Sequence, residues 1–95
     1  MPPDVARVGF PHDDAVPEFV IHHRHAPAER GAFFASFQGH VSPVRRRPAP
    51  TSCHQGGHDI WWFVEADTAA GALELVPKYV AERAFVTQVE RVVMP

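Results

Sequence analysis

The stretch "DIWWFVE" near the middle of the chain constrains the fold more than any other feature. In an extended strand, Ile60, Trp62 and Val64 point to one face, while Trp61 and Phe63 point to the other. A strand with one face in water usually alternates apolar and polar residues, but this strand is apolar on both faces. The pattern therefore predicts a central strand in a sheet that is covered on both sides.

The other elements are predicted from hydrophobic periodicity, turn residues and helix-capping residues around this strand. Two glycines, Gly56 and Gly57, separate it from a shorter extended run and favour a tight β-hairpin turn. The expected elements are a strand at 18–25, a helix at 27–40, strands at 51–55 and 58–66, a helix at 67–83 that begins at the N-cap Asp67 and is interrupted at Pro77, and a strand at 85–94.

The order β-α-β-β-α-β is that of the ferredoxin-like split βαβ arrangement. We predict an α+β domain over residues 18–95, in which a four-stranded antiparallel sheet carries both helices on one face. Residues 1–17 contain four prolines and no periodicity, so we expect them to form a flexible proline-rich arm. The helices leave one sheet face open although the central strand is apolar there, so a homodimer of the dimeric α+β barrel type is predicted.

Composition limits the function classes that this chain can belong to. Its 95 residues suffice for one small domain, and its net charge of −2 argues against general nucleic-acid binding. No run is long enough to cross a membrane, and the N-terminus lacks the apolar segment of a signal peptide. The single cysteine cannot form an internal disulfide, which is typical of a reducing compartment. We therefore expect a cytoplasmic protein without nucleic-acid or membrane partners.

The seven histidines are clustered, and the expected topology brings several of them to one end of the sheet. In the ferredoxin-like strand order 4-1-3-2, the end of the first strand carries His23 and His25, next to the start of the third strand with His58. The second strand ends at the same edge with Cys53. Thiolate and imidazole donors suit zinc, nickel or copper better than magnesium or calcium. These four residues are the predicted metal ligands, and the alternation leaves open whether the two pairs share a face.

An inert alternative exists for each of these polar residues. The four candidates could form a hydrogen-bonded cluster at a strand edge, and a free cysteine is often simply buried. His54 is expected opposite Asp59, as an oriented general base or, as we favour, a weak cross-strand ion pair. His22 lies on the opposite face of its strand and suits the surface or the dimer interface.

Two other functions compete with metal binding. One is a dimeric α+β barrel enzyme of the isomerase, cyclase or monooxygenase type, with His23 or His58 as general base and a small hydrophobic substrate. The other is a non-catalytic interaction module that uses the proline-rich arm and the arginine loop at 42–50, although such loops are usually just solvated. The substrate pocket of the enzyme would be lined by Phe33, Phe37, Trp62 and Tyr79.

The segments "EFVIHHRH", "SPVRRRPAPTSCHQGGHDIWWFVEA" and "LVPKYVAERA" resemble a group of small actinobacterial proteins that share an SC-x-x-GGH-x-x-WW core and an H-x-H first strand. The resemblance covers roughly residues 18–95. More distantly, the architecture is similar to nickel-responsive ferredoxin-like proteins and to dimeric α+β barrel isomerases and monooxygenases. The group carries a cysteine early in its first helix, where this chain has Arg30, so a site that uses this cysteine would differ here.

Overall fold

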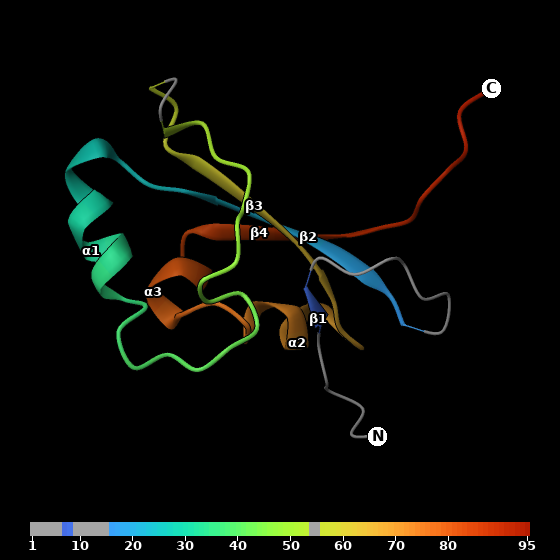
Figure 1. Ribbon diagram of the computed structural model, residues 1–95, viewed down its shortest axis with the longest axis horizontal. Coiled ribbons are helices and arrows are strands. Elements are labelled where there is room, and N and C mark those ends of the chain that lie inside the picture. The colour runs from blue at the N-terminus through green and yellow to red at the C-terminus, as the bar shows by residue number, and fades with distance from the viewer. Residues whose placement is uncertain (1–6, 9–15, 54–55) are drawn as a thin grey trace.

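The computed structural model describes residues 7–8, 16–53 and 56–95 of the chain. Its elements form a small α+β fold in which an antiparallel sheet carries several short helices (Figure 1). The elements are β1 (Arg7–Val8), β2 (Glu18–Arg24), a 3₁₀ turn (Pro27–Glu29), α1 (Arg30–Ala35), β3 (Asp59–Glu65), α2 (Ala69–Leu73), α3 (Lys78–Ala81) and β4 (Ala84–Val89).

The sheet has the order β1-β3-β2-β4, and every neighbouring pair is antiparallel. The predicted α+β class is therefore confirmed, and β2 lies between β3 and β4 as expected. Ile21 at the centre of β2 pairs with Trp62 of β3 on one side and with Val86 of β4 on the other. This register places Phe19, Ile21, Ile60, Trp62 and Val64 on one face, where they pack against the helices.

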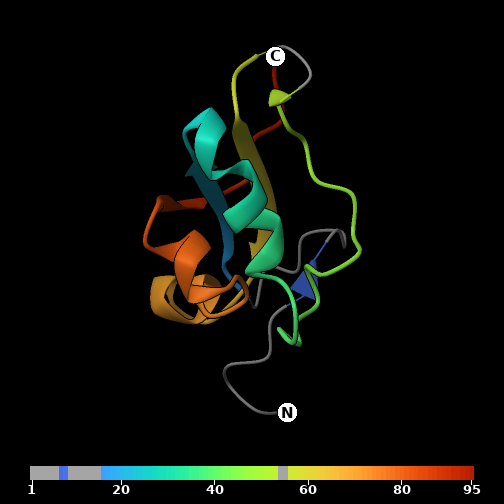
Figure 2. The same cartoon turned by 90° about the vertical axis from the view of Figure 1, so that its left-hand side faces the viewer.

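The hydrophobic core fills the space between that face and the helices. Within the described chain, β2 and β3 contribute most of its buried strand residues, and the helical segments contribute Phe33, Ala72 and Val80. Figure 2 shows α2 and α3 next to each other beside the strands. The opposite face of the sheet carries the partly exposed Phe63 and the well-exposed Phe85.

The predicted strand at 51–55 is wrong for the residues that the structure describes. Thr51 alone forms a β-bridge with Ile60, and the Trp61 N–H donates to the carbonyl of Pro50 at 3.0 Å. The expected register placed Cys53 opposite Ile60, and the observed one is shifted by two residues. The reason is that the Ser52 side chain, rather than its backbone, accepts the next bond of the ladder, so the chain leaves the sheet early.

The far end of β3 pairs with β1, which belongs to the predicted arm. Its backbone at Arg7–Val8 lies opposite Val64 and Glu65, so a four-stranded sheet forms with a different edge strand from the one expected. The prediction of a flexible arm concerns residues that are mostly outside the described part of the chain.

Helix boundaries differ from the predicted ones for local reasons. The helical segment at 27–40 starts as a 3₁₀ turn and ends as tight turns after Ala35, with Gly39 in the left-handed region as the exit. Thr68, not Asp67, caps α2, because its Oγ1 accepts a hydrogen bond from the Gly71 N–H at 2.9 Å. Pro77 separates α2 from α3, as the sequence indicates, because proline offers no N–H to a continuous helix.

The last strand, β4, ends at Val89, several residues before the predicted end. The chain instead leaves the sheet in an extended course toward the C-terminus (Figure 1).

Candidate metal centre

The candidate metal centre begins where β2 ends. His23 and His25 are two residues apart, so their side chains point to the same, helix-covered face, and their exposed fractions are 0% and 4%. The His25 N–H donates to the His58 carbonyl at 3.3 Å, which extends the β2–β3 pairing one step past Arg24 and Asp59. Opposite residues of an antiparallel pair share a face, so His25 and His58 come together.

Two hydroxyl side chains build the loop that carries Cys53 and His58. The Ser52 N–H donates to the Asp59 carbonyl at 2.9 Å, and the Asp59 N–H donates to the Ser52 Oγ at 3.0 Å. The Thr51 hydroxyl donates to the same carbonyl at 2.9 Å and accepts from the Cys53 N–H at 3.2 Å. Because Cys53 follows Ser52 and His58 precedes Asp59, these four bonds fix the cysteine and the histidine relative to each other.

The turn between them requires its glycines. Gly56 has φ +81°, and a Cβ on Gly57 would lie within 2.7 Å of the Ser52 Cβ and still nearer its Oγ. His58 also adopts a left-handed backbone with φ 59°, which costs a non-glycine residue about 1–2 kcal/mol. Such strain persists only where neighbouring contacts impose it, and it is concentrated at functional sites.

His25, Cys53 and His58 form the one group of potential metal ligands found among the described residues. A ring nitrogen of each histidine and the Cys53 Sγ all lie within 4.8 Å of one another. His25 Nε2 and His58 Nδ1 are buried and have no hydrogen-bond partner in the described structure. Buried polar atoms are nearly always paired, so two unpartnered nitrogens beside one thiol mark this group as a candidate ligand site.

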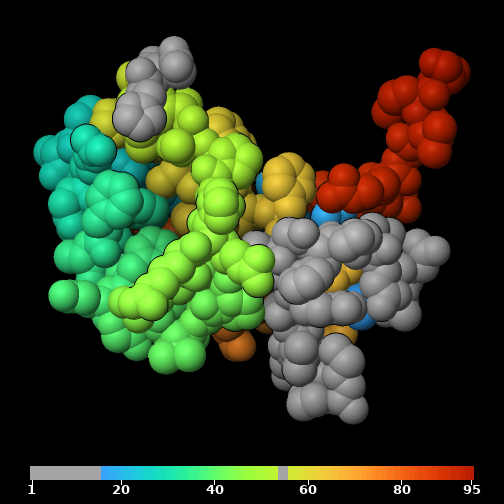
Figure 3. Space-filling view, viewed as in Figure 1, coloured from blue at the N-terminus to red at the C-terminus, as the bar shows by residue number. Residues whose placement is uncertain are grey.

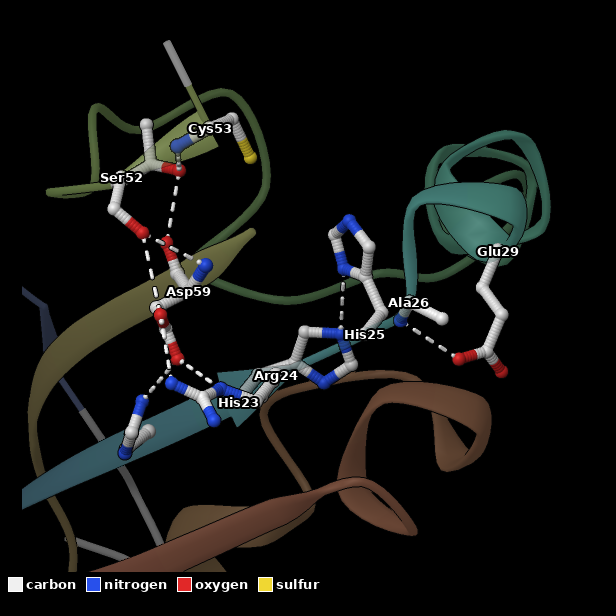
Figure 4. A network of polar contacts seen from close by, with 10 residues as sticks. His23, Arg24, His25, Ala26, Glu29, Ser52, Cys53 and Asp59 are labelled. Carbon is white, nitrogen blue, oxygen red and sulfur yellow. Dashed lines mark hydrogen bonds and ion pairs between the residues drawn. The ribbon is translucent and has the colours of Figure 1, made fainter. Parts of the chain in front are cut away.

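His23 determines which nitrogen of His25 is available. His23 Nδ1 lies 3.1 Å from the Val80 carbonyl, which can only accept, so this nitrogen carries the proton. His23 Nε2 is therefore the acceptor for His25 Nδ1–H, at 3.1 Å. The His25 proton is thus held on Nδ1, and Nε2 presents a lone pair away from His23. Figure 4 shows this nitrogen on the side of the ring toward Cys53.

Burial keeps this pair of rings neutral. Desolvation lowers the pKa of His23 below its usual value, with a smaller contribution from the positive charge that His25 would carry. Desolvation also lowers the pKa of His25, and the neighbouring His58 adds to this effect. Neutral imidazole is the form that binds a metal ion.

The structure thus brings together three of the four predicted ligands. His23 is set behind His25, with both ring nitrogens engaged, so it orients a candidate ligand and does not face the cluster. This arrangement is the usual one around metal-binding histidines, whose second nitrogen is held by a hydrogen bond.

Two of the predicted secondary residues, His22 and Asp59, lie on the opposite face of the sheet. Asp59 accepts hydrogen bonds from Arg24 Nε and pairs with His22 Nε2, both at 2.8 Å. Hydrogen bonding to Arg24, then to His22, lowers the pKa of Asp59 to about 2. His22 also stacks on Trp61 with ring centroids 5.0 Å apart. The predicted partner of Asp59, His54, lies outside the described residues.

A cavity of about 330 Å³ adjoins the cluster, between α1, the segment 44–53 and β3. Three of the predicted pocket residues, Phe33, Phe37 and Trp62, line it, and so does Cys53. Phe33 also stacks on the rings of His23 and His25, each at 4.9 Å between centroids. The cavity therefore shares Cys53 with the cluster, and the Phe33 ring contacts both the cavity and the buried rings of His23 and His25.

Tyr79, the fourth predicted pocket residue, is placed elsewhere. Its hydroxyl donates to Glu29 Oε2 at 3.1 Å, and its ring lies under the Arg83 guanidinium at 3.9 Å. Arg83 Nε donates to the same carboxylate oxygen at 2.9 Å, while Glu29 Oε1 accepts from the Ala26 N–H. This network ties α3 to the segment that follows β2.

Sequence reasoning missed two sets of residues. Thr51 and Ser52 position the cluster, and the only signal for them is the occurrence of small hydroxyl residues beside a Gly-Gly turn. A proline-flanked arginine loop is usually solvated, yet Arg45, Arg46 and Arg47 line the cavity together with Arg30. Their folding back depends on Val44, whose side chain is buried in the core at 2% exposure.

No protein-family model, curated protein or solved structure matches this chain. None of the helices in the described ranges is long and apolar enough to cross a membrane. The geometry of the cluster and of the cavity is therefore the basis for assigning a function.

Proposed function

We propose that this protein binds a transition-metal ion through His25 Nε2, Cys53 Sγ and His58 Nδ1. The observation that carries the proposal is the pair of buried, unpartnered imidazole nitrogens beside the thiol. An orphaned buried polar atom costs about 1–3 kcal/mol, and a bound cation would satisfy both nitrogens. The strained backbone of His58 is a second, independent indication that this residue is held for a purpose.

The donor set favours zinc, nickel or copper. One thiolate and two imidazoles are soft to borderline ligands, whereas magnesium and calcium take oxygen. The cluster contains no carboxylate among the described residues. Zinc accepts this set in a tetrahedral geometry without any redox change, so it is the reference ion for the experiments.

Three protein donors leave a tetrahedral ion one further position. In zinc proteins, four protein ligands are typical of structural sites, and three with an exchangeable fourth are typical of catalytic ones. We therefore propose a site with an exchangeable position, which would be filled by water or by a small molecule from the adjoining cavity.

The test is metal binding by protein purified without an affinity tag. Zn²⁺ titrated against a chromophoric chelator should give one equivalent per chain. Co²⁺ in its place should give thiolate-to-metal charge transfer and the visible bands of a tetrahedral ion. His25→Ala and Cys53→Ser should each abolish the stoichiometric site, as loss of one of three ligands cannot be compensated.

His40→Gln serves as the matched control. His40 is outside the cluster, and its Nε2 donates to the Leu75 carbonyl at 2.9 Å, a bond that the glutamine amide can also make. This variant should bind metal as the wild type does. Weak binding that neither His25→Ala nor Cys53→Ser reduces would contradict the proposal.

A further inference from the structure

The cavity beside Cys53 has walls suited to a flat apolar group. Its volume of about 330 Å³ is at the lower end for small-molecule sites. Aromatic rings from α1 and the turn after it form one wall, and Trp62 and Ile60 of β3 form another. Phe33 stacks with Trp62 at 6.5 Å between centroids, and Phe37 lies 6.4 Å from the same ring. Such walls favour a planar aromatic ligand by stacking and by burial of apolar surface.

The charge around the cavity is strongly positive. Arg30, Arg45, Arg46 and Arg47 line it, and its described lining contains no acidic residue. This is a local reversal in a chain whose net charge is −2. The Arg30 guanidinium lies over the ring of Phe34, which lines the cavity, and Arg45 donates to the His40 carbonyl at 3.4 Å.

The arginine-bearing segment is fixed by the fold. Val44 is buried in the core, and the Ser42 hydroxyl donates to the Leu75 carbonyl, at 2.5 Å, and accepts from the Val44 N–H. In Figure 3 the segment 42–52 crosses this side of the molecule beside α1. Several guanidinium groups next to aromatic walls fit a carboxylate attached to a ring, because arginine recognises carboxylates through paired donors.

We propose that this cavity binds a small aromatic carboxylate next to the metal centre. The ring lies against the aromatic walls of the cavity, and the carboxylate is held by the arginines. This ligand class deepens the proposed function. Only the statement that the ligand lies close to a metal ion rests on that function. Cys53 belongs to both the cavity and the cluster, so a bound carboxylate is near the exchangeable position of the ion.

The test compares 2-naphthoate with its neutral analogue 2-naphthamide, with tryptophan fluorescence as the readout. Naphthoate should bind at least about tenfold more tightly than naphthamide, because the neutral amide cannot make the charge-assisted hydrogen bond of the carboxylate. Arg30→Gln combined with Arg46→Gln should remove this preference. Lys78→Gln, which removes one positive charge from the exposed surface of α3, should retain it.

Measurements in EDTA and with Zn²⁺ separate this proposal from the metal proposal. Naphthoate binding in EDTA supports the cavity proposal even for protein that binds no metal. Failure of naphthoate to bind under either condition overturns it, even where Zn²⁺ binds stoichiometrically. Equal affinity for the acid and the amide also overturns it. Ala49→Trp, which fills the cavity from its wall, should abolish binding while the far-ultraviolet circular dichroism stays that of the wild type.

Discussion

Replacing His23 with leucine tests the inference that this residue positions a metal ligand. Leucine has a similar volume but offers neither the donor to Val80 nor the acceptor for His25. The His25 Nδ1–H would be left buried without a partner. The Val80 carbonyl would lose this donor but would keep the hydrogen bond that it accepts from the Arg83 N–H at 3.1 Å.

The expected loss of stability follows from these two changes. An orphaned buried donor costs about 1–3 kcal/mol, and a lost neutral hydrogen bond costs about 0.5–1.5 kcal/mol. The metal-free variant should therefore be destabilised by about 2–4 kcal/mol, a large part of the 5–15 kcal/mol that is typical of a domain. Its zinc affinity should fall by about 10–100-fold, because His25 loses its orientation.

His23→Gln is the matched variant for this experiment. The amide can donate to the Val80 carbonyl through Nε2 and accept from His25 through Oε1, so most of the stability and affinity should return. Urea denaturation of the metal-free proteins measures the free energy of unfolding, and competition with a chromophoric chelator measures zinc affinity.

Two results would refute the reasoning. One is a His23→Leu protein that is folded and binds zinc as tightly as the wild type. The other is an equal loss of affinity in the leucine and glutamine variants, since that would mean that His23 is itself a ligand.

Three further predictions concern other parts of the molecule. Gly57→Ala must displace Ser52 from its bonds to Asp59, so the free energy of unfolding should fall by about 1–3 kcal/mol and zinc affinity should fall with it. Gly31→Ala is the control, because its added methyl group lies in open space on α1, and it should be neutral or stabilising. Denaturation curves of the two variants measure these changes in stability. Hydrogen bonds from the Ala26 N–H and then from Arg83 and Tyr79 lower the pKa of Glu29 to about 2. The stabilising effect of the Glu29 carboxylate is therefore present above its unfolded pKa of about 4.5 and is lost as pH falls toward 2. In Glu29→Gln the melting temperature should depend less on pH across that window. The chain should sediment as a homodimer at micromolar concentration, and Phe85→Asp on the open sheet face should make it monomeric; a wild-type monomer would contradict the expectation.

The strand pattern predicted most of the sheet because alternation and burial determine it. The run from Asp59 to Glu65 is apolar on both faces only if it is central, and it pairs on both edges as that pattern requires. Val64 is the clearest example, with 1% of its side chain exposed. The edge beside it was not predictable, because side-chain hydrogen bonds of Thr51 and Ser52 end the expected strand, and periodicity carries no information about them.

The ligand cluster was predictable in its residue types and in its place, but not in its roles. The topology brings His25 and Cys53 to the same end of the sheet for any register. Whether His25 shares a face with His58 depends on the register of β2 against β3, which alternation alone leaves open. The role of His23 depends on the carbonyl of Val80, more than fifty residues away in sequence, and no local pattern indicates it.

The hydrogen bond from His23 to Val80 would also make the proposed metal centre and α3 thermodynamically linked. A shift of α3 that stretches this bond would change the basicity and orientation of His25, and so the affinity for metal. Linkage is reciprocal, so an ion on His25 would favour the placement of α3 that makes the bond by the same free energy. A molecule that binds against α3 would then control metal uptake without touching a single ligand.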